Sequence, residues 1–207
     1  MSDDIKTILI LSSYSSGSTA VAGFVELCGA YSCPPLTVTN DPLTPSAKEP
    51  VEYRNILVSC IDELSLRKQK PSSVFLDFFA KWHPAQLLKA SEVGSKVIVL
   101  KHPLQAFFLD EIFEICDPKL VLVHRPFNNI EATRLRRQWH PVYGKAGARV
   151  IYNSLYSKLH EGSKSYISVP YESFLTHLAI QQDLLSFCSI NPTPSELTEA
   201  RKFLRVK

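Results

Sequence analysis

The sequence has no long apolar run, few glycines and little net charge, and each shortage excludes a class of protein. No apolar run in the 207 residues approaches the about 18 residues that cross a membrane, so we expect no membrane span. The acidic start 1–4 leads into a short apolar segment only, which predicts no secretory signal. A net charge of +3 is too small to indicate a nucleic-acid-binding protein.

Cysteine is also too scattered to build a site. No pair among the five cysteines repeats at the spacing of zinc ligands, and most of them lie inside apolar segments. We therefore expect buried, reduced thiols in a cytoplasmic protein, and no bound metal. With 45% apolar and 21% charged residues, the composition is that of a folded domain rather than a disordered chain.

Four short apolar runs predict the strands of a sheet. They are rich in Ile, Val and Leu without polar alternation, which is typical of strands buried on both faces of a parallel sheet. The runs are 5–11, 96–100, 119–123 and 165–169. Segments that can be helical follow them, so we expect an α/β fold with a three-layer, doubly wound, mainly parallel sheet of the P-loop nucleotide-binding type. All of 1–207 is expected to form one domain.

Three stretches depart from this alternation. Residues 31–50 contain five prolines and are predicted to be a long surface loop, of the kind that is often functional. Residues 73–79 form an ambiguous fifth strand, in which Asp77 is a candidate carboxylate base. Residues 191–207 open with two prolines and are predicted to continue as a short basic helix.

Polar residues follow each predicted strand and should meet at one edge of the sheet. The carboxyl ends of parallel strands share an edge, and ligands bind in the crevice there. The residues concerned are the hydroxyl-rich turn 12–19, Lys101, His102, His124, Arg125, Tyr171 and Glu172. Hydroxyls, cations and an aromatic ring suit a phosphorylated nucleotide better than an apolar ligand. Strand alternation points His124 away from Arg125, so we expect His124 to be structural.

The turn after the first strand is the most informative of these segments. A strand-to-helix turn exposes backbone N–H groups and the positive end of a helix dipole, which together bind anions. In the ATP-binding pattern G-x-x-x-x-G-K-[ST], Gly17 and Thr19 match, but Ser12 replaces the first Gly and Ser18 replaces the Lys. The missing Lys disfavours a kinase, because that residue holds the β- and γ-phosphates. A Ser-rich turn without any ligand is the alternative.

Four segments in order resemble the sulfotransferase family, and its compact bacterial-type members in particular. The turn YSSGST at 14–19 resembles their 5′-phosphosulfate-binding loop, which usually reads P-[KR]-S-G-[TS]-[TS]. KLVLVHRPFNNIEATRLRR resembles their 3′-phosphate-binding element, where a strand ends in Arg and a Ser follows eight residues later, matched here by Arg125 and Thr133. VIVLKHP resembles the strand ending in Lys that precedes a catalytic His, and ISVPYESFL resembles the late strand whose Tyr lies near the adenine.

The resemblance implies a metal-free sulfotransferase that moves a sulfuryl group from 3′-phosphoadenosine 5′-phosphosulfate to a hydroxyl or amine. It implies that Lys101 is a catalytic cation, and His102 is the best general base because imidazole titrates near neutrality. The implied nucleotide-binding residues are Ser15, Ser16, Gly17, Ser18, Thr19, Arg125, Thr133 and Tyr171. Ser15 stands where the family loop carries Lys or Arg. A nucleotide-binding protein without transfer activity is therefore one alternative, and a P-loop small-molecule kinase is another.

The acceptor is expected to be a small molecule or a glycan. A basic set could receive an anionic acceptor or be a solvated face: Arg134, Arg136, Arg137, Lys145 and Arg149. Trp82, Trp139 and Tyr143 could line an acceptor pocket, although packing in the core or at its rim is the better interpretation.

Overall fold

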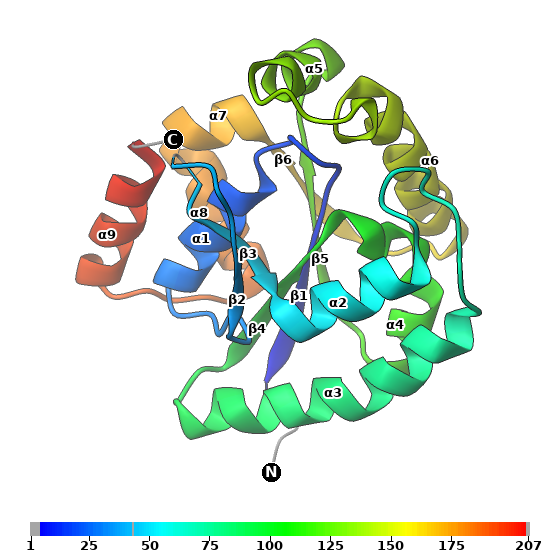
Figure 1. The fold of residues 1–207 in the computed structure, drawn as a ribbon. Helices are drawn as coiled ribbons and strands as arrows, with labels where there is room; N and C mark the ends of the chain where they lie inside the picture. Colours follow the sequence, from blue (N-terminus) through cyan, green and yellow to red (C-terminus); the bar gives the residue numbers. More distant parts are fainter. Residues whose placement is uncertain (1–4, 43, 206–207) are drawn as a thin grey trace.

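The central sheet has four parallel strands in the order β4-β1-β5-β6 (Figure 1). They are β1 (Lys6–Leu11), β4 (Val97–Lys101), β5 (Lys119–His124) and β6 (Tyr166–Pro170). Each strand lies within one residue of a run predicted from the sequence, and the parallel pairing confirms the expected α/β fold. This computed structural model describes residues 5–42 and 44–205, so the N-terminal expectation for 1–4 falls outside it.

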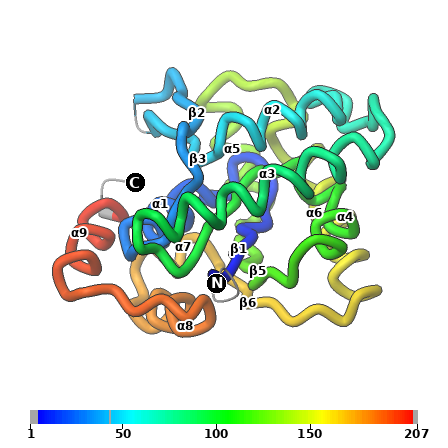
Figure 2. The backbone as a smooth tube through the Cα atoms, turned by 90° about the horizontal axis from the view of Figure 1, so that it is seen from below, coloured from blue at the N-terminus to red at the C-terminus, as the bar shows by residue number. Residues whose placement is uncertain are grey.

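Helices cover both faces of this sheet and complete three layers. Leu9 and Leu11 of β1 pack into a core with α2, α3, α4 and α6, whereas Ile8 and Ile10 pack into a second core with α1, α8 and α9. Figure 2 shows α8 and α9 on one side of the strands and α4 and α6 on the other. Burial on both faces explains why β1 has no polar alternation.

The helices of the described residues follow the strands in chain order, and α9 confirms the helix expected in the tail. They are α1 (Ser18–Leu27), α2 (Val51–Cys60), α3 (Ser72–Glu92), α4 (Leu109–Ile115), α5 (Phe127–Arg136), α6 (Lys145–Glu161), α7 (Tyr171–Thr176), α8 (Leu178–Cys188) and α9 (Pro194–Arg205). Short 3₁₀ helices, η1 (Pro103–Phe107) and η2 (Pro141–Tyr143), follow β4 and α5.

Two expectations drawn from the composition can be compared with the structure. All five cysteines are free thiols, and all but the half-buried Cys116 are buried. Within residues 5–42 and 44–205, no helix combines the length and the apolar character that a membrane crossing requires.

The predicted strand at 73–79 is wrong, because these residues belong to helix α3. Phe75, Phe79 and Trp82 recur at helical spacing, and all three pack around Tyr53 of α2. A short apolar run does not by itself distinguish a strand from a buried helix. Asp77 is exposed on α3 and is not among the residues that line the cavity described below, so nothing places it near the chemistry.

The predicted loop at 31–50 is also wrong in part, because it contains a β-hairpin. Strand β2 (Leu36–Val38) pairs antiparallel with β3 (Ser46–Pro50). The prolines indicated a loop, but Pro45 precedes β3 and Pro50 ends it, where a missing N–H costs the ladder little. The hairpin lies beside the carboxyl ends of β1 and β4, and it becomes one wall of the site.

Strand β1 is the point at which the order of strands reverses. The next strand of the sheet, β4, pairs on one side of β1, and the following one, β5, pairs on the other. Ligands of open parallel sheets bind outside the carboxyl ends of the strands at such a point. In Figure 1 these ends point towards α5.

Candidate active site

A cavity of about 490 Å³ opens at the carboxyl ends of β1, β4 and β5. Its walls come from the turn after β1, the β2–β3 hairpin, the end of β4, helix α5 and the start of α7. All the site residues expected from the sequence line it: Ser15, Ser16, Gly17, Ser18, Thr19, Lys101, His102, Arg125, Thr133 and Tyr171. The fold therefore brings the residues of the four resembling segments together around one space.

The turn after β1 has the backbone of an anion-binding loop. Gly17 has φ 88° immediately before α1, and Ser15 has φ 58°. A Cβ on Gly17 would lie 2.1 Å from the ring of Tyr171, so both the left-handed backbone and the close ring require glycine. The first N–H groups of α1 have no partner inside the helix and can donate to a phosphate.

The serine hydroxyls of this turn hold the turn itself. Ser16 Oγ donates to the carbonyl oxygen of Ser13 at 2.8 Å, and Ser15 Oγ donates to the carbonyl oxygen of Tyr143 at 2.9 Å. The backbone is therefore the main source of donors for an anion here. The side chain at the position of the family's loop cation is tied to η2.

Arg125 and Thr133 meet on the β5 side of the turn. Arg125 Nη1 donates to Thr133 Oγ1 at 2.8 Å, and its Nε donates to Glu172 Oε1 at 2.7 Å. The guanidinium also lies over the Tyr171 ring, 5.0 Å from its centroid. An arginine beside a hydroxyl can bind a phosphate through charge-assisted hydrogen bonds. We call Arg125, Thr133, Tyr171 and Glu172 the β5 end of the cavity.

Lys101 and Glu49 form a buried ion pair on the β4 side of the turn. Lys101 Nζ lies 2.6 Å from Glu49 Oε1, and the two side chains are 6% and 10% exposed. Lys101 Nζ also donates to the carbonyl oxygen of Ala47 at 3.0 Å and to Thr19 Oγ1 at 3.3 Å. Burial alone would raise the pKa of Glu49, but the charges of Lys101 and His102 hold it below its ordinary value.

His102 lies fully buried beside this pair, and both of its ring nitrogens are engaged. Its Nδ1 accepts a hydrogen bond from the Leu104 N–H at 3.1 Å, so Nε2 carries the proton and faces Glu49 Oε2 at 3.7 Å. Burial lowers the pKa of His102 to about 4, so the ring is neutral at pH 7. Neither nitrogen then has a free lone pair, whereas the carboxylate of Glu49 can accept a proton. We call Glu49, Lys101 and His102 the β4 end.

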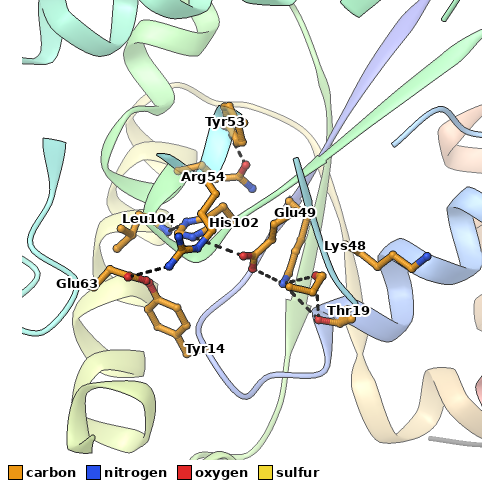
Figure 3. A network of polar contacts seen from close by, with 12 residues as sticks. Tyr14, Thr19, Lys48, Glu49, Tyr53, Arg54, Glu63, His102 and Leu104 are labelled. Atoms are coloured by element: carbon orange, nitrogen blue, oxygen red, sulfur yellow. Dashed lines mark hydrogen bonds and ion pairs between the residues drawn. The ribbon is translucent and has the colours of Figure 1, made fainter. Parts of the chain in front are cut away.

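A second ion pair continues this network away from the sheet (Figure 3). Arg54 Nη2 lies 3.2 Å from Glu63 Oε2, and Tyr14 Oη donates to Glu63 Oε1 at 3.0 Å. Burial and the nearby carboxylates raise the pKa of Tyr14 far above its ordinary value, so its hydroxyl stays protonated. Lys48, next to Glu49 in the chain, points away and pairs with Glu26.

The aromatic candidates are divided between the cavity and the core. Trp139 and Tyr143 line the cavity, and the Tyr143 ring packs edge-on against Tyr14 with centroids 4.7 Å apart. Trp82 is buried under α2, where its Nε1 donates to Glu52. The core interpretation therefore holds for Trp82 but not for the other two.

The basic candidates are likewise divided. Arg136 and Arg137 line the cavity, whereas Arg134 pairs with Glu131 and Arg149 lies 5.9 Å from the Phe127 ring. The remaining member, Lys145, begins α6. His124 lines a separate groove with Phe127 and is absent from the cavity's described lining, as its place opposite Arg125 predicts.

Glu49, Glu63 and Arg54 are the site residues that sequence reasoning missed. Glu49 lies in the stretch that reads as a loop, and Glu63 and Arg54 belong to no motif. A carboxylate at the end of a hairpin strand carries no local signal for a contact with a lysine 52 residues away.

The fold has a known structural neighbour. The chain is similar to the sulfotransferase domain from the Synechococcus PCC 7002 olefin synthase, with a TM-score of 0.60 and 17% sequence identity. The similarity covers 95% of this chain and 78% of that one. The fold is sulfotransferase-like. The sequence itself matches no protein-family model and no curated protein sequence.

Proposed function

We propose that this protein is a sulfotransferase that uses 3′-phosphoadenosine 5′-phosphosulfate and a hydroxyl or amine acceptor. The observation that carries the proposal is the hydrogen bond between Arg125 and Thr133, beside the turn at Gly17 and within the cavity that also holds Lys101. A donor with phosphate groups at both the 3′ and 5′ positions needs two anion sites in one cavity. The turn supplies one, and the β5 end supplies the other.

The residues of the chain divide the proposed work between the two ends. Backbone N–H groups around Gly17 bind the 5′-phosphosulfate, while Arg125 and Thr133 bind the 3′-phosphate. When bound, the donor supplies the sulfuryl group, whose bond to the phosphate oxygen breaks as the acceptor oxygen or nitrogen bonds to sulfur. Lys101 stabilises the negative charge of the departing oxygen, as cations do in the related phosphoryl transfers.

We assign the acceptor's proton to Glu49. Its carboxylate is ionised at neutral pH and lies in the cavity wall beside Lys101. His102 then acts through Glu49 as a positioning residue, because its Nε2–H faces Glu49 and its Nδ1 is bonded to the backbone. The proposal departs here from the expectation that His102 takes the proton itself.

A second candidate is a protein that binds the nucleotide but does not transfer the sulfuryl group. Two observations favour it: Ser15 is bonded to the Tyr143 carbonyl where the family loop has a cation, and Lys101 is already paired with Glu49. Turnover separates the two functions. If product nucleotide binds but the donor is never consumed across an acceptor panel, the protein is a binding protein.

The binding half of the proposal can be tested by thermal unfolding with nucleotides. Adenosine 3′,5′-bisphosphate at 100 times its Kd should stabilise the protein by about 2.7 kcal/mol, a shift of roughly 5–10 °C. AMP and ATP at the same concentration should stabilise it less. Arg125→Ala should remove the difference between the bisphosphate and AMP, whereas Arg149→Ala, which removes an exposed charge outside the cavity, should preserve it. Equal stabilisation of the unaltered protein by all three nucleotides would exclude a 3′-phosphate site.

The transfer half can be tested by following donor consumption. Glu49→Gln should lower kcat strongly and leave the affinity for adenosine 3′,5′-bisphosphate nearly unchanged, because Gln cannot accept the proton. His102→Gln should lower kcat less, since it acts through Glu49. If His102→Gln abolishes turnover while Glu49→Gln does not, the two roles are exchanged and His102 is the base.

A further inference from the structure

Arg137 lies on the same helical face as Thr133, one turn further along the chain. Asn129, Thr133 and Arg137 are spaced by four residues and therefore share one face of α5 and its C-terminal cap. Thr133 already bonds to Arg125, and Arg137 lines the same cavity. Burial lowers the pKa of the Arg137 guanidinium, and the positive charges of Arg136 and Arg125 lower it further. Three arginines therefore gather at this end of the cavity.

The hairpin holds Arg137 from the opposite wall. Its Nη2 pairs with Asp41 and donates to Thr44 Oγ1 at 3.2 Å, and its guanidinium lies 4.5 Å from the Trp139 ring centroid. The Nε of Arg137 is buried and has no hydrogen-bond partner among the described residues. A guanidinium has five N–H donors, and an unpaired buried donor is costly. This arginine can therefore bind more acceptor oxygens than Asp41 and Thr44 supply.

Like charges collected around a cavity indicate an anionic ligand. One carboxylate on Arg137 and one on Arg125 carry a single negative charge each, whereas a phosphate monoester carries nearly two and has three acceptor oxygens. Both pairs are partly exposed, with the Arg137 and Asp41 side chains at 19% and 17%. A phosphate can therefore reach these guanidinium groups and compete with the carboxylates.

We propose that Arg137 determines specificity for the 3′-phosphate together with Arg125, and that Asp41 competes with that phosphate for Arg137. This inference rests on the proposed function and adds to it a second arginine and a competing carboxylate. Without nucleotide, the Asp41 pair holds the hairpin against the end of α5. When the phosphate binds, it replaces Asp41 on the Arg137 guanidinium.

The experiment compares the Kd of adenosine 3′,5′-bisphosphate with that of AMP by calorimetry, using the full chain. The ratio of the two Kd values isolates the 3′-phosphate, because both ligands share the adenosine and the 5′-phosphate. Arg137→Gln should reduce this preference by at least tenfold, and Arg137→Lys should reduce it less. Arg149→Ala removes one exposed positive charge outside the cavity and should leave the ratio unchanged. Asp41→Asn keeps a hydrogen-bond acceptor, removes the charge, and should tighten bisphosphate binding several-fold without changing AMP binding.

Each outcome has one interpretation. If Arg125→Ala removes the preference but both Arg137 variants keep it, the inference is overturned and the proposed function stands. If the unaltered protein has no preference, both are overturned. If Asp41→Asn weakens bisphosphate binding, Asp41 positions Arg137 and the competition is refuted. A purely structural Arg137–Asp41 pair would lower the thermal stability of the nucleotide-free variants and leave the Kd ratio unchanged. Arg137→Lys covers the case in which Arg137→Gln does not fold.

Discussion

The two ends of the cavity use the same kind of pair, a cation with a carboxylate, but bury it to different depths. At the β4 end the Lys101 and Glu49 side chains are 6% and 10% exposed, whereas at the β5 end Arg125 and Glu172 are 20% and 43% exposed. A buried pair that loses one partner leaves an uncompensated charge, but water screens a half-exposed one. The β4 end is therefore a fixed part of the fold, and the β5 end can exchange its carboxylate for a ligand.

The largest expected effect is the loss of the buried cation. Lys101→Met leaves Glu49 charged and unpaired in the interior and should lower the free energy of unfolding by about 3–5 kcal/mol, measured by urea denaturation at pH 7. Lys101→Met combined with Glu49→Gln should recover most of the loss, since no buried charge remains.

The matched control is the exposed pair Lys202–Glu199 on α9. Lys202→Met removes the same charge from a solvated position and should change the stability by less than about 1 kcal/mol. Equal losses for Lys101→Met and Lys202→Met would contradict the difference in burial on which the comparison depends.

The next effect is the pH dependence contributed by His102. Its pKa is about 4 when folded and about 6.5 when unfolded, so the unfolded chain binds more protons between these values. Stability should therefore be full above pH 6.5 and fall as the pH drops towards 4, by up to about 3 kcal/mol from this residue. His83, buried with its pKa also lowered to about 4, adds a second contribution of the same sign.

The measurement is the free energy of unfolding at several pH values between 6.5 and 4.5, above the ordinary pKa of a glutamate. His102→Gln should reduce the slope in this window, and His102→Gln with His83→Gln should nearly abolish it. An unchanged slope in the double variant would show that other groups control the acid lability.

Gly17 joins the two ends, and its replacement should have an intermediate effect. Gly17→Ala forces a Cβ into the Tyr171 ring and a side chain into a left-handed backbone, and it should cost about 2–3 kcal/mol. Gly94→Ala is the control, because Gly94 has φ 75° and no atom within 4 Å of the added Cβ. It should lose only the backbone contribution of about 1 kcal/mol.

The double variant Gly17→Ala/Tyr171→Ala separates the two causes. Removal of the ring should restore the part of the stability that the clash costs and leave the backbone cost in place. If the double variant is no more stable than expected from adding the two single losses, the ring does not impose the glycine. Unfolding in urea measures all four chains.

The β5 end could be predicted from the sequence and the β4 end only in part, for a physical reason. Arg125 follows a strand and Thr133 lies eight residues on in a helix, so regular geometry fixes their distance. Glu49 reaches Lys101 only because a hairpin folds over the sheet, and the prolines of 31–50 hide that hairpin. Likewise, the apolar run at 73–79 shows burial but not its helical form, which depends on packing against α2.

The smallest expected effect comes from the exchangeable carboxylate. Glu172→Gln removes the charge beside Arg125 but keeps an oxygen that can accept from both Arg125 Nε and Asn129 Nδ2. Because the Glu172 side chain is 43% exposed, water compensates for the lost charge and the free energy of unfolding should change by less than about 1 kcal/mol. Urea denaturation beside Lys101→Met measures the contrast. A loss above about 2 kcal/mol would mean that the Arg125–Glu172 pair is as fixed as the Lys101–Glu49 pair, and that a phosphate could not displace this carboxylate at so small a cost.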